Sequence, residues 1–133
     1  MDSSKTIIVD VDGVIAKTNN GDYATAEPLK HGIEQINKLY HAGYHIILFT
    51  ARYGDREAGC IQRQYNRGYE ELKNWLWSYG VQFHELWLGK PAGILYIDDK
   101  GARVSGDDED GWQHVWDSLE IAKKKDKYGV DKS

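Results

Sequence analysis

The stretch Thr6–Ile15 reads Thr-Ile-Ile-Val-Asp-Val-Asp-Gly-Val-Ile, an apolar run interrupted by two acids and a glycine. Its β-branched residues are typical of a strand buried on both faces of a parallel sheet. Carboxylates are rarely buried without a partner, so Asp10 and Asp12 indicate a bound cation or a chemical role. Two interpretations stay open for this segment alone. It is either a ligand site at a strand end, or an ordinary strand-to-turn junction in which Asp and Gly13 supply the turn.

The length and composition describe one ordinary domain. The chain has 133 residues and a net charge of −4, which argues against a nucleic-acid backbone as the main partner. Cys60 is the single cysteine, which excludes an internal disulfide and suits a reducing cytoplasm. No apolar run reaches membrane length, and Met1–Lys5 lacks the core of a signal peptide. We therefore expect a cytoplasmic protein without a membrane partner, folded as a single domain over residues 1–133. Its core spans about 6–122, and 123–133 form a charged tail.

Apolar strands and amphipathic helices alternate along the chain, which predicts βαβ units and parallel strands. Beyond the first strand, strands are expected at Tyr44–Thr50, Val81–Leu88 and Ile94–Ile97. Helices are expected from Pro28 to a stop at Gly43, over Tyr65–Tyr79 with a stop at Gly80, and from Trp112 onward. Ala16–Glu27 is expected to be a polar loop, and Tyr53–Asn66 a loop or an irregular helix.

Polar groups stand at the ends of these expected strands, and parallel strands bring such ends to one edge of the sheet. The groups are Asp10 and Asp12, Thr50, Lys90, and Asp98 and Asp99. Two carboxylates ~4 Å apart repel each other by about 4 kcal/mol at an effective dielectric constant of 20. A cation is therefore expected among these acids. Oxygen ligands favour Mg²⁺, and a hydroxyl with a lysine suits a phosphate. Together these groups indicate phosphoryl transfer to an aspartate.

At these residues the sequence resembles the haloacid dehalogenase (HAD) superfamily, in its phosphatase branch. Ile7–Val14 (IIVDVDGV) is similar to the first motif of the family, and Leu48–Arg52 (LFTAR) to the second. Leu88–Pro91 (LGKP) is similar to the third motif, and Tyr96–Lys100 (YIDDK) to the fourth. The motifs occur in the family's order over about Thr6–Val104. The resemblance implies a three-layer α/β/α, Rossmann-like fold with a mainly parallel sheet.

The resemblance also implies a role for each catalytic residue. Asp10 would attack the phosphorus and become an aspartyl phosphate, while Asp12 would protonate the leaving alcohol and later activate water. Thr50 and the Ala51 backbone N–H would hold the phosphoryl oxygens, and Lys90 would offset negative charge.

The remaining roles concern the metal and the substrate. Mg²⁺ would lie between the Asp10 carboxylate, the Asp12 carbonyl and Asp98, with Asp99 bound directly or through water. Asp99 could instead be a turn residue, and Thr50 could cap a helix. Arg52 either contacts the substrate or pairs with a nearby carboxylate.

No interval between the motifs is long enough for a folded cap domain, so the resemblance is to a capless enzyme. The motif phrases are most similar to small phosphatases of capsule and surface-polysaccharide synthesis, which implies a sugar phosphate or related small substrate. In this class a second copy of the chain is a candidate for covering the open site.

Two alternatives stay open. A polynucleotide 3′-phosphatase would need a basic groove around Arg56, Arg63 and Arg67. A non-catalytic Rossmann-like or receiver-type phosphoacceptor domain would take up phosphate stably and would not turn over.

Overall fold

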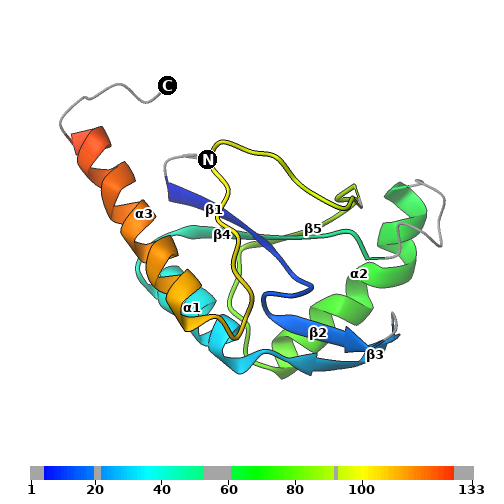
Figure 1. Ribbon diagram of the computed structural model, residues 1–133. Coiled ribbons are helices and arrows are strands. Elements are labelled where there is room, and N and C mark those ends of the chain that lie inside the picture. The colour runs from blue at the N-terminus through cyan, green and yellow to red at the C-terminus, as the bar shows by residue number, and fades with distance from the viewer. Residues whose placement is uncertain (1–4, 20–21, 53–60, 92, 128–133) are drawn as a thin grey trace.

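The structure is a computed structural model that describes residues 5–19, 22–52, 61–91 and 93–127 of the chain. It is a Rossmann-like α/β fold in which a parallel three-stranded sheet is flanked by helices, which confirms the predicted fold class (Figure 1). In chain order the elements are β1 (Thr6–Asp10), β2 (Ala16–Asn19), β3 (Asp22–Pro28), α1 (Lys30–His41), β4 (His45–Thr50), α2 (Ile61–Ser78), β5 (Glu85–Leu88) and α3 (Glu109–Lys127).

The sheet has the order β1-β4-β5, and both neighbouring pairs are parallel, as the βαβ pattern predicts. The register pairs Asp10 with Phe49 across β1 and β4, and it pairs Thr50 with Leu88 across β4 and β5. The last residues of the three strands therefore lie at one edge of the sheet. This edge is where ligands collect in open α/β sheets.

The core lies between the sheet and helices α1 and α2. Residues with completely buried side chains come from all of these elements: Ile36 and Leu39 on α1, Ile46 and Leu48 on β4, and Leu72 and Leu76 on α2. Helix α3 packs beside α1, where Trp116 Nε1 donates a hydrogen bond to Gln35 Oε1 at 3.0 Å (Figure 1). Ile8 on β1 is 64% exposed, so the expectation that this strand is buried on both faces was wrong.

Glycines end two elements where the sequence predicts. Gly43 follows α1 with φ 100°, and Gly80 follows α2 with φ 72°, in the left-handed region that glycine adopts at little cost. Helix α2 begins at Ile61, so residues 61–66 belong to a regular helix rather than to a loop or an irregular helix. The rest of that segment, 53–60, lies outside the described residues. Helix α3 continues through Lys127 into the predicted tail, of which 128–133 lie outside the description.

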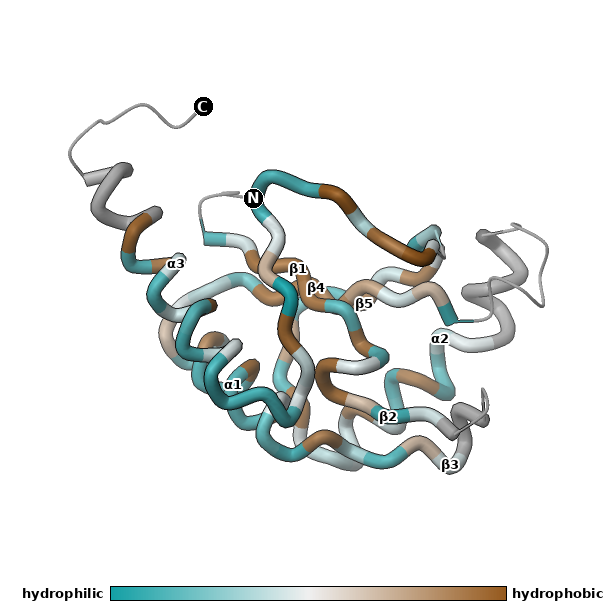
Figure 2. Tube along the Cα trace, viewed as in Figure 1, coloured by the Kyte–Doolittle hydropathy of each residue, from teal (hydrophilic) through white to brown (hydrophobic). Residues whose placement is uncertain are grey.

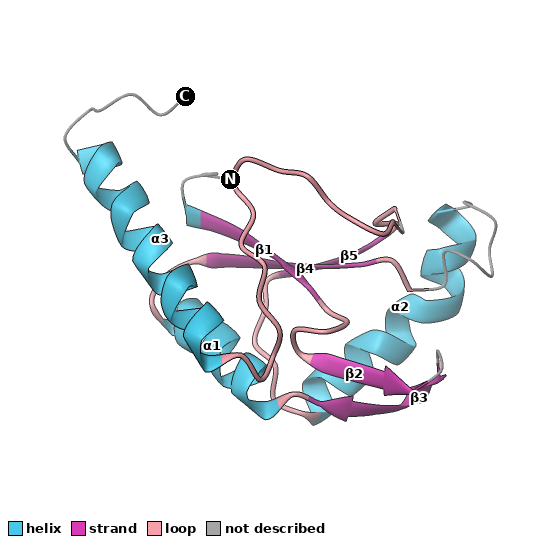
Figure 3. Ribbon diagram, viewed as in Figure 1, coloured by secondary structure: helices cyan, strands magenta, loops and turns pink. Residues whose placement is uncertain are grey.

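The polar segment Ala16–Glu27 is not a loop. It forms most of an antiparallel hairpin of β2 and β3, with Ala16 paired to Pro28. The hairpin lies beside α2 and apart from the parallel sheet (Figure 3). It is the only addition between β1 and α1, and no folded cap domain occurs in the described ranges.

The fourth strand expected at Ile94–Ile97 does not form, and this prediction was wrong. The segment lies in the loop between β5 and α3, and exposed fractions run from 52% at Tyr96 to 105% at Ile94. Figure 2 shows brown, apolar stretches on the loop that connects β5 to α3, away from the strands of the sheet. Gly89, with φ 94°, and Pro91 turn the chain after β5, and the Tyr96 hydroxyl then donates to the Pro91 carbonyl. The segment therefore bonds to the turn that follows β5 and does not pair with β1.

Candidate active site

The loop after β1 is a tight turn that holds the two acids of the first motif at the sheet edge. The Val11 carbonyl accepts hydrogen bonds from the backbone N–H groups of Ile15 and Ala16 at 3.0 and 3.1 Å. Gly13 has φ 91°, a conformation that a side chain would strain. The strand ends at Asp10, so Asp10 and Asp12 do not continue one extended strand. They meet different partners.

Asp10 is paired with Lys90. The Lys90 Nζ lies 3.1 Å from Asp10 Oδ2, and the side chains are 16% and 38% exposed, respectively. The Lys90 backbone N–H donates to the Thr50 carbonyl at 3.1 Å. This hydrogen bond extends the contact between the two chain segments beyond the last residue of β5. This backbone contact places the lysine at the edge where β1 ends. The structure thus brings the Lys90 ammonium to Asp10, while its predicted role in offsetting the charge of a bound phosphate stays a prediction.

The pKa of Asp10 is raised above the ordinary value for an aspartate. Burial is the largest cause, because it disfavours the charged form. The hydrogen bond and positive charge of Lys90 lower the pKa, and the negative charge of Asp12 raises it further. Burial therefore outweighs the favourable contact with Lys90. An aspartate whose pKa is perturbed by burial and by a specific partner is a candidate functional residue.

Asp12 is held by residues from the end of β4. Arg52 Nε lies 3.0 Å from Asp12 Oδ1 and 3.1 Å from Oδ2, and Nη2 lies 2.9 Å from Oδ1. The Thr50 hydroxyl donates to Asp12 Oδ2 at 3.3 Å and accepts from the Arg52 backbone N–H at 3.1 Å. The structure thus joins the first two motifs through one network. Of the two interpretations of Arg52, it shows the pairing with a carboxylate.

The described residues do not form the magnesium site that the resemblance implies. Asp98 and Asp99 lie in the exposed loop after β5, where Asp98 Oδ1 accepts from the Lys100 backbone N–H at 2.8 Å. Within the described ranges, no three acidic, histidine or cysteine side chains are grouped so that they could hold a metal. Asp98 and Asp99 are therefore not gathered with Asp10 and Asp12. The carboxylates at the strand end face basic side chains instead, which is a donor set that does not fit Mg²⁺ as it stands.

Some of the expected roles stay predictions. Thr50 is buried and its hydroxyl is engaged by Asp12 and Arg52, so phosphate binding would need it to exchange partners. Ala51 lies between these residues on the same short segment. The region of Arg56 lies outside the described residues, as do the side chains of Arg63 and Arg67.

Tyr96 is a site neighbour that sequence reasoning missed. The Lys90 Nζ lies 4.1 Å from the centre of its ring, a cation–π contact on the lysine that pairs with Asp10. The apolar row around Tyr96 predicted a strand, and nothing in that row indicated a contact with Lys90.

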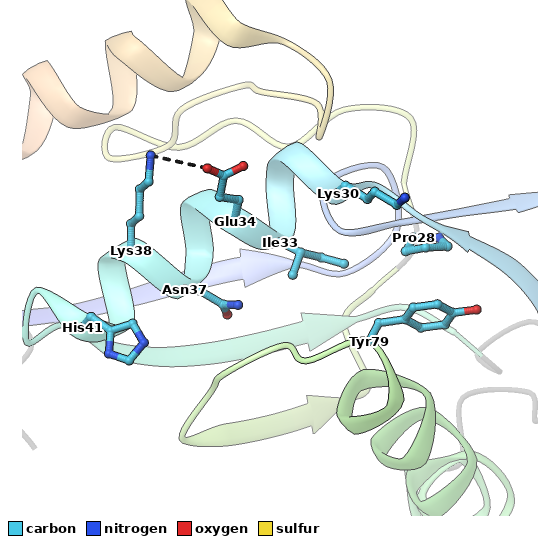
Figure 4. Close-up of a pocket in the computed structure, with 8 residues that line it drawn as sticks. All are labelled: Pro28, Lys30, Ile33, Glu34, Asn37, Lys38, His41 and Tyr79. Carbon is cyan, nitrogen blue, oxygen red and sulfur yellow. Dashed lines mark ion pairs between the residues drawn. The ribbon is translucent and has the colours of Figure 1, made fainter.

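One hollow of the described surface lies away from these residues. It has a volume of about 480 Å³ and lies between α1 and the turn after α2 (Figure 4). Its lining includes Ile33 and Tyr79, and its Lys38 and Glu34 form an ion pair at 3.7 Å. Its lining contains none of the residues at the carboxyl edge of the parallel sheet, namely Asp10, Asp12, Thr50, Arg52 and Lys90. Within the described residues, no helix is both long and apolar enough to cross a lipid bilayer.

Comparisons with known proteins support the fold and name no activity. No protein-family model matches the chain, and no curated protein matches it. The chain is similar to the crystal structure of an MCSG target from Vibrio cholerae, with 27% sequence identity and a TM-score of 0.75. The match covers 88% of this chain and 98% of the Vibrio chain. Nearly the whole Vibrio fold is therefore shared.

Proposed function

We propose that this protein is a phosphomonoesterase that forms an aspartyl phosphate on Asp10. The observation that carries the proposal is the placement of Asp10 at the carboxyl end of β1, with the Lys90 Nζ at 3.1 Å. A nucleophilic carboxylate needs a position that a substrate can reach and a positive charge to offset the incoming phosphate. Asp10, with a side chain 38% exposed, has both.

The chemistry has two steps. In the first, an Asp10 carboxylate oxygen forms a bond to phosphorus while the bond from phosphorus to the ester oxygen breaks. Asp12 has to carry a proton before this step, and it donates that proton to the leaving alkoxide. In the second, Asp12 takes a proton from water as the water attacks the phosphorus of the acyl phosphate. Phosphate leaves and the Asp10 carboxylate is restored. Lys90 offsets the negative charge in both steps.

Magnesium and the substrate class belong to the proposal through the sequence resemblance. Mg²⁺ is the implied cofactor, although the acids as described do not gather around one position. A phosphorylated sugar or a related small metabolite is the proposed substrate. Supporting observations are the net charge of −4, which disfavours a polyanion, and a described chain without a cap domain, which leaves the strand ends open.

The test is phosphate release from a panel of sugar phosphates, nucleotides, 3′-phosphorylated oligonucleotides and 4-nitrophenyl phosphate, with Mg²⁺ and with a chelator. Asp10→Asn should remove turnover, and Asp12→Asn should lower it by about 10²–10⁴-fold. Asp117→Asn on the exposed side of α3 is the matched control, and it should behave as wild type. Asp10→Asn should unfold at a temperature close to that of wild type. Asp12→Asn should stay folded at the assay temperature but unfold at a lower temperature, because the buried Arg52 loses its charged partner.

The outcomes separate the proposal from its alternatives. Wild-type rates in Asp10→Asn would refute the mechanism. A preference for the oligonucleotides would indicate a polynucleotide 3′-phosphatase instead. Stable phosphorylation of the protein by a small phosphodonor, without turnover of any ester, would indicate a receiver-type phosphoacceptor domain.

A further inference from the structure

We infer that Arg52 is a positioning residue for Asp12, and that it acts through the orientation of this carboxylate rather than through contact with substrate. The inference rests on the proposed function, because it assigns Arg52 a part in proton transfer by Asp12. Three observations support this role of Arg52: the arrangement of its contacts with Asp12, the burial of the guanidinium and the connection of Arg52 to the end of β4.

The contacts between Arg52 and Asp12 define an orientation. Two guanidinium nitrogens, Nε and Nη2, lie within 2.9–3.1 Å of the carboxylate oxygens. Nε donates to both carboxylate oxygens, and Nη2 adds an ion contact to Oδ1, so the planar guanidinium restrains the orientation of the carboxylate as well as its distance. A lysine in the same place would supply the charge without this constraint.

The burial of the two side chains differs. The Arg52 side chain is 1% exposed, whereas that of Asp12 is 33% exposed. A substrate that arrives from solvent can reach the Asp12 carboxyl, but it cannot reach the guanidinium while this pair is formed. The arginine therefore acts on the reaction through Asp12.

A hydrogen bond from the Arg52 backbone also supports the arrangement. The Arg52 N–H donates to the Thr50 hydroxyl, and that hydroxyl donates to Asp12 Oδ2. Asp12 is thus held from the end of β4 by a side-chain pair and by a hydroxyl bridge. Misplacing a catalytic group by about 1 Å can cost 10²-fold in rate, so loss of this support should be measurable.

A positioning role predicts a dependence on the leaving group. An alkyl phosphate releases a strongly basic alkoxide and needs the proton from Asp12, whereas 4-nitrophenolate leaves without one. In a single turnover, Arg52→Gln should slow release of an alkyl alcohol by about 10²-fold. It should change release of 4-nitrophenolate by less than about 5-fold, since attack by Asp10 does not involve the arginine.

Two further variants complete the experiment. Arg52→Lys keeps the charge and loses the two-nitrogen contact, so its selective loss on alkyl phosphates should fall between those of wild type and Arg52→Gln. It also carries the test if Arg52→Gln fails to fold. Arg103→Gln removes the same kind of side chain from an exposed position and is the matched control, with wild-type rates expected on both substrates.

An equal loss on both leaving groups in a folded variant would overturn the inference, because a purely structural role moves both rates together. So would wild-type rates on the alkyl phosphate. In either case a selective loss in Asp12→Asn would leave the proposed phosphatase function standing. A wild-type protein that releases no phosphate from any ester would instead refute the function itself, and the inference with it.

Discussion

Gly32→Ala is the substitution that most directly tests how the loop of the first motif is held. Gly32 lies in the first turns of α1, and a Cβ there would lie 1.9 Å from the Val14 carbonyl oxygen and 3.0 Å from Gly106 Cα. Both are main-chain atoms, so neither can rotate away. The same loop is also held from the other side, where the Gly106 N–H donates to the Gly13 carbonyl at 2.9 Å.

The magnitude follows from two opposed effects. Replacing glycine by alanine inside a helix stabilises by about 1 kcal/mol through helix propensity alone. An ordinary contact of a Cβ begins at about 3.4 Å, so the carbonyl must move by about 1.5 Å. Such overpacking costs about 3 kcal/mol when main-chain atoms must shift. The net expectation is a loss of about 2 kcal/mol, which lowers Tm by roughly 6–10 °C in a chain of this length.

Thermal unfolding followed by circular dichroism measures this loss. Gly101→Ala is the matched control, because a Cβ there meets only the Asp98 Cβ at 3.6 Å, an ordinary contact. It should change the unfolding free energy by no more than about 0.5 kcal/mol. A Gly32→Ala protein that unfolds at or above the wild-type temperature would refute the close approach of α1 to Val14.

Two further predictions concern Lys90 and the loop after β5. Lys90→Gln removes the partner that lowers the pKa of Asp10, so the pKa should rise further. A nucleophilic carboxylate must be ionised, and the fall of kcat/KM with decreasing pH should therefore begin at a higher pH. A pH profile on 4-nitrophenyl phosphate with an unchanged acidic limb would contradict this. Ile97→Ala should change the free energy of unfolding by at most about 0.5 kcal/mol, because Ile97 is 93% exposed. A loss of about 2–5 kcal/mol in denaturant titrations would show that Ile97 is buried instead.

The alternation of apolar strands with amphipathic helices was sufficient to predict the parallel ladder of β1, β4 and β5. Local chemistry at Gly43 and Gly80 likewise marked the ends of α1 and α2, because only glycine adopts these φ values at little cost. Such features depend on residues close together in the chain. They could be predicted without knowledge of the tertiary structure.

The expected strand at Ile94–Ile97 shows where this approach fails. An apolar row of four residues is compatible with a strand, but it does not determine whether the edge of a sheet will pair with it. In the structure, Gly89 and Pro91 turn the chain, and Tyr96 packs on Lys90 and bonds to Pro91. The hairpin of β2 and β3 was missed for a related reason. Its residues Lys17 and Glu27 pair across strands that lie apart from the main sheet, and their polarity indicated a loop.

The electrostatics of the site required the tertiary structure as well. From the sequence, acids at neighbouring strand ends implied repulsion that only a cation could relieve. In the structure, Asp98 and Asp99 are not part of the group, and each acid of the first motif meets one base. Arg52 reaches Asp12 from the end of β4, and Lys90 reaches Asp10 from beyond β5. The repulsion at the strand ends is thus balanced by these side chains. A metal ion that binds there has to compete with Lys90 and Arg52 for the same oxygens, so the requirement for Mg²⁺ does not follow from the charge of the acids alone.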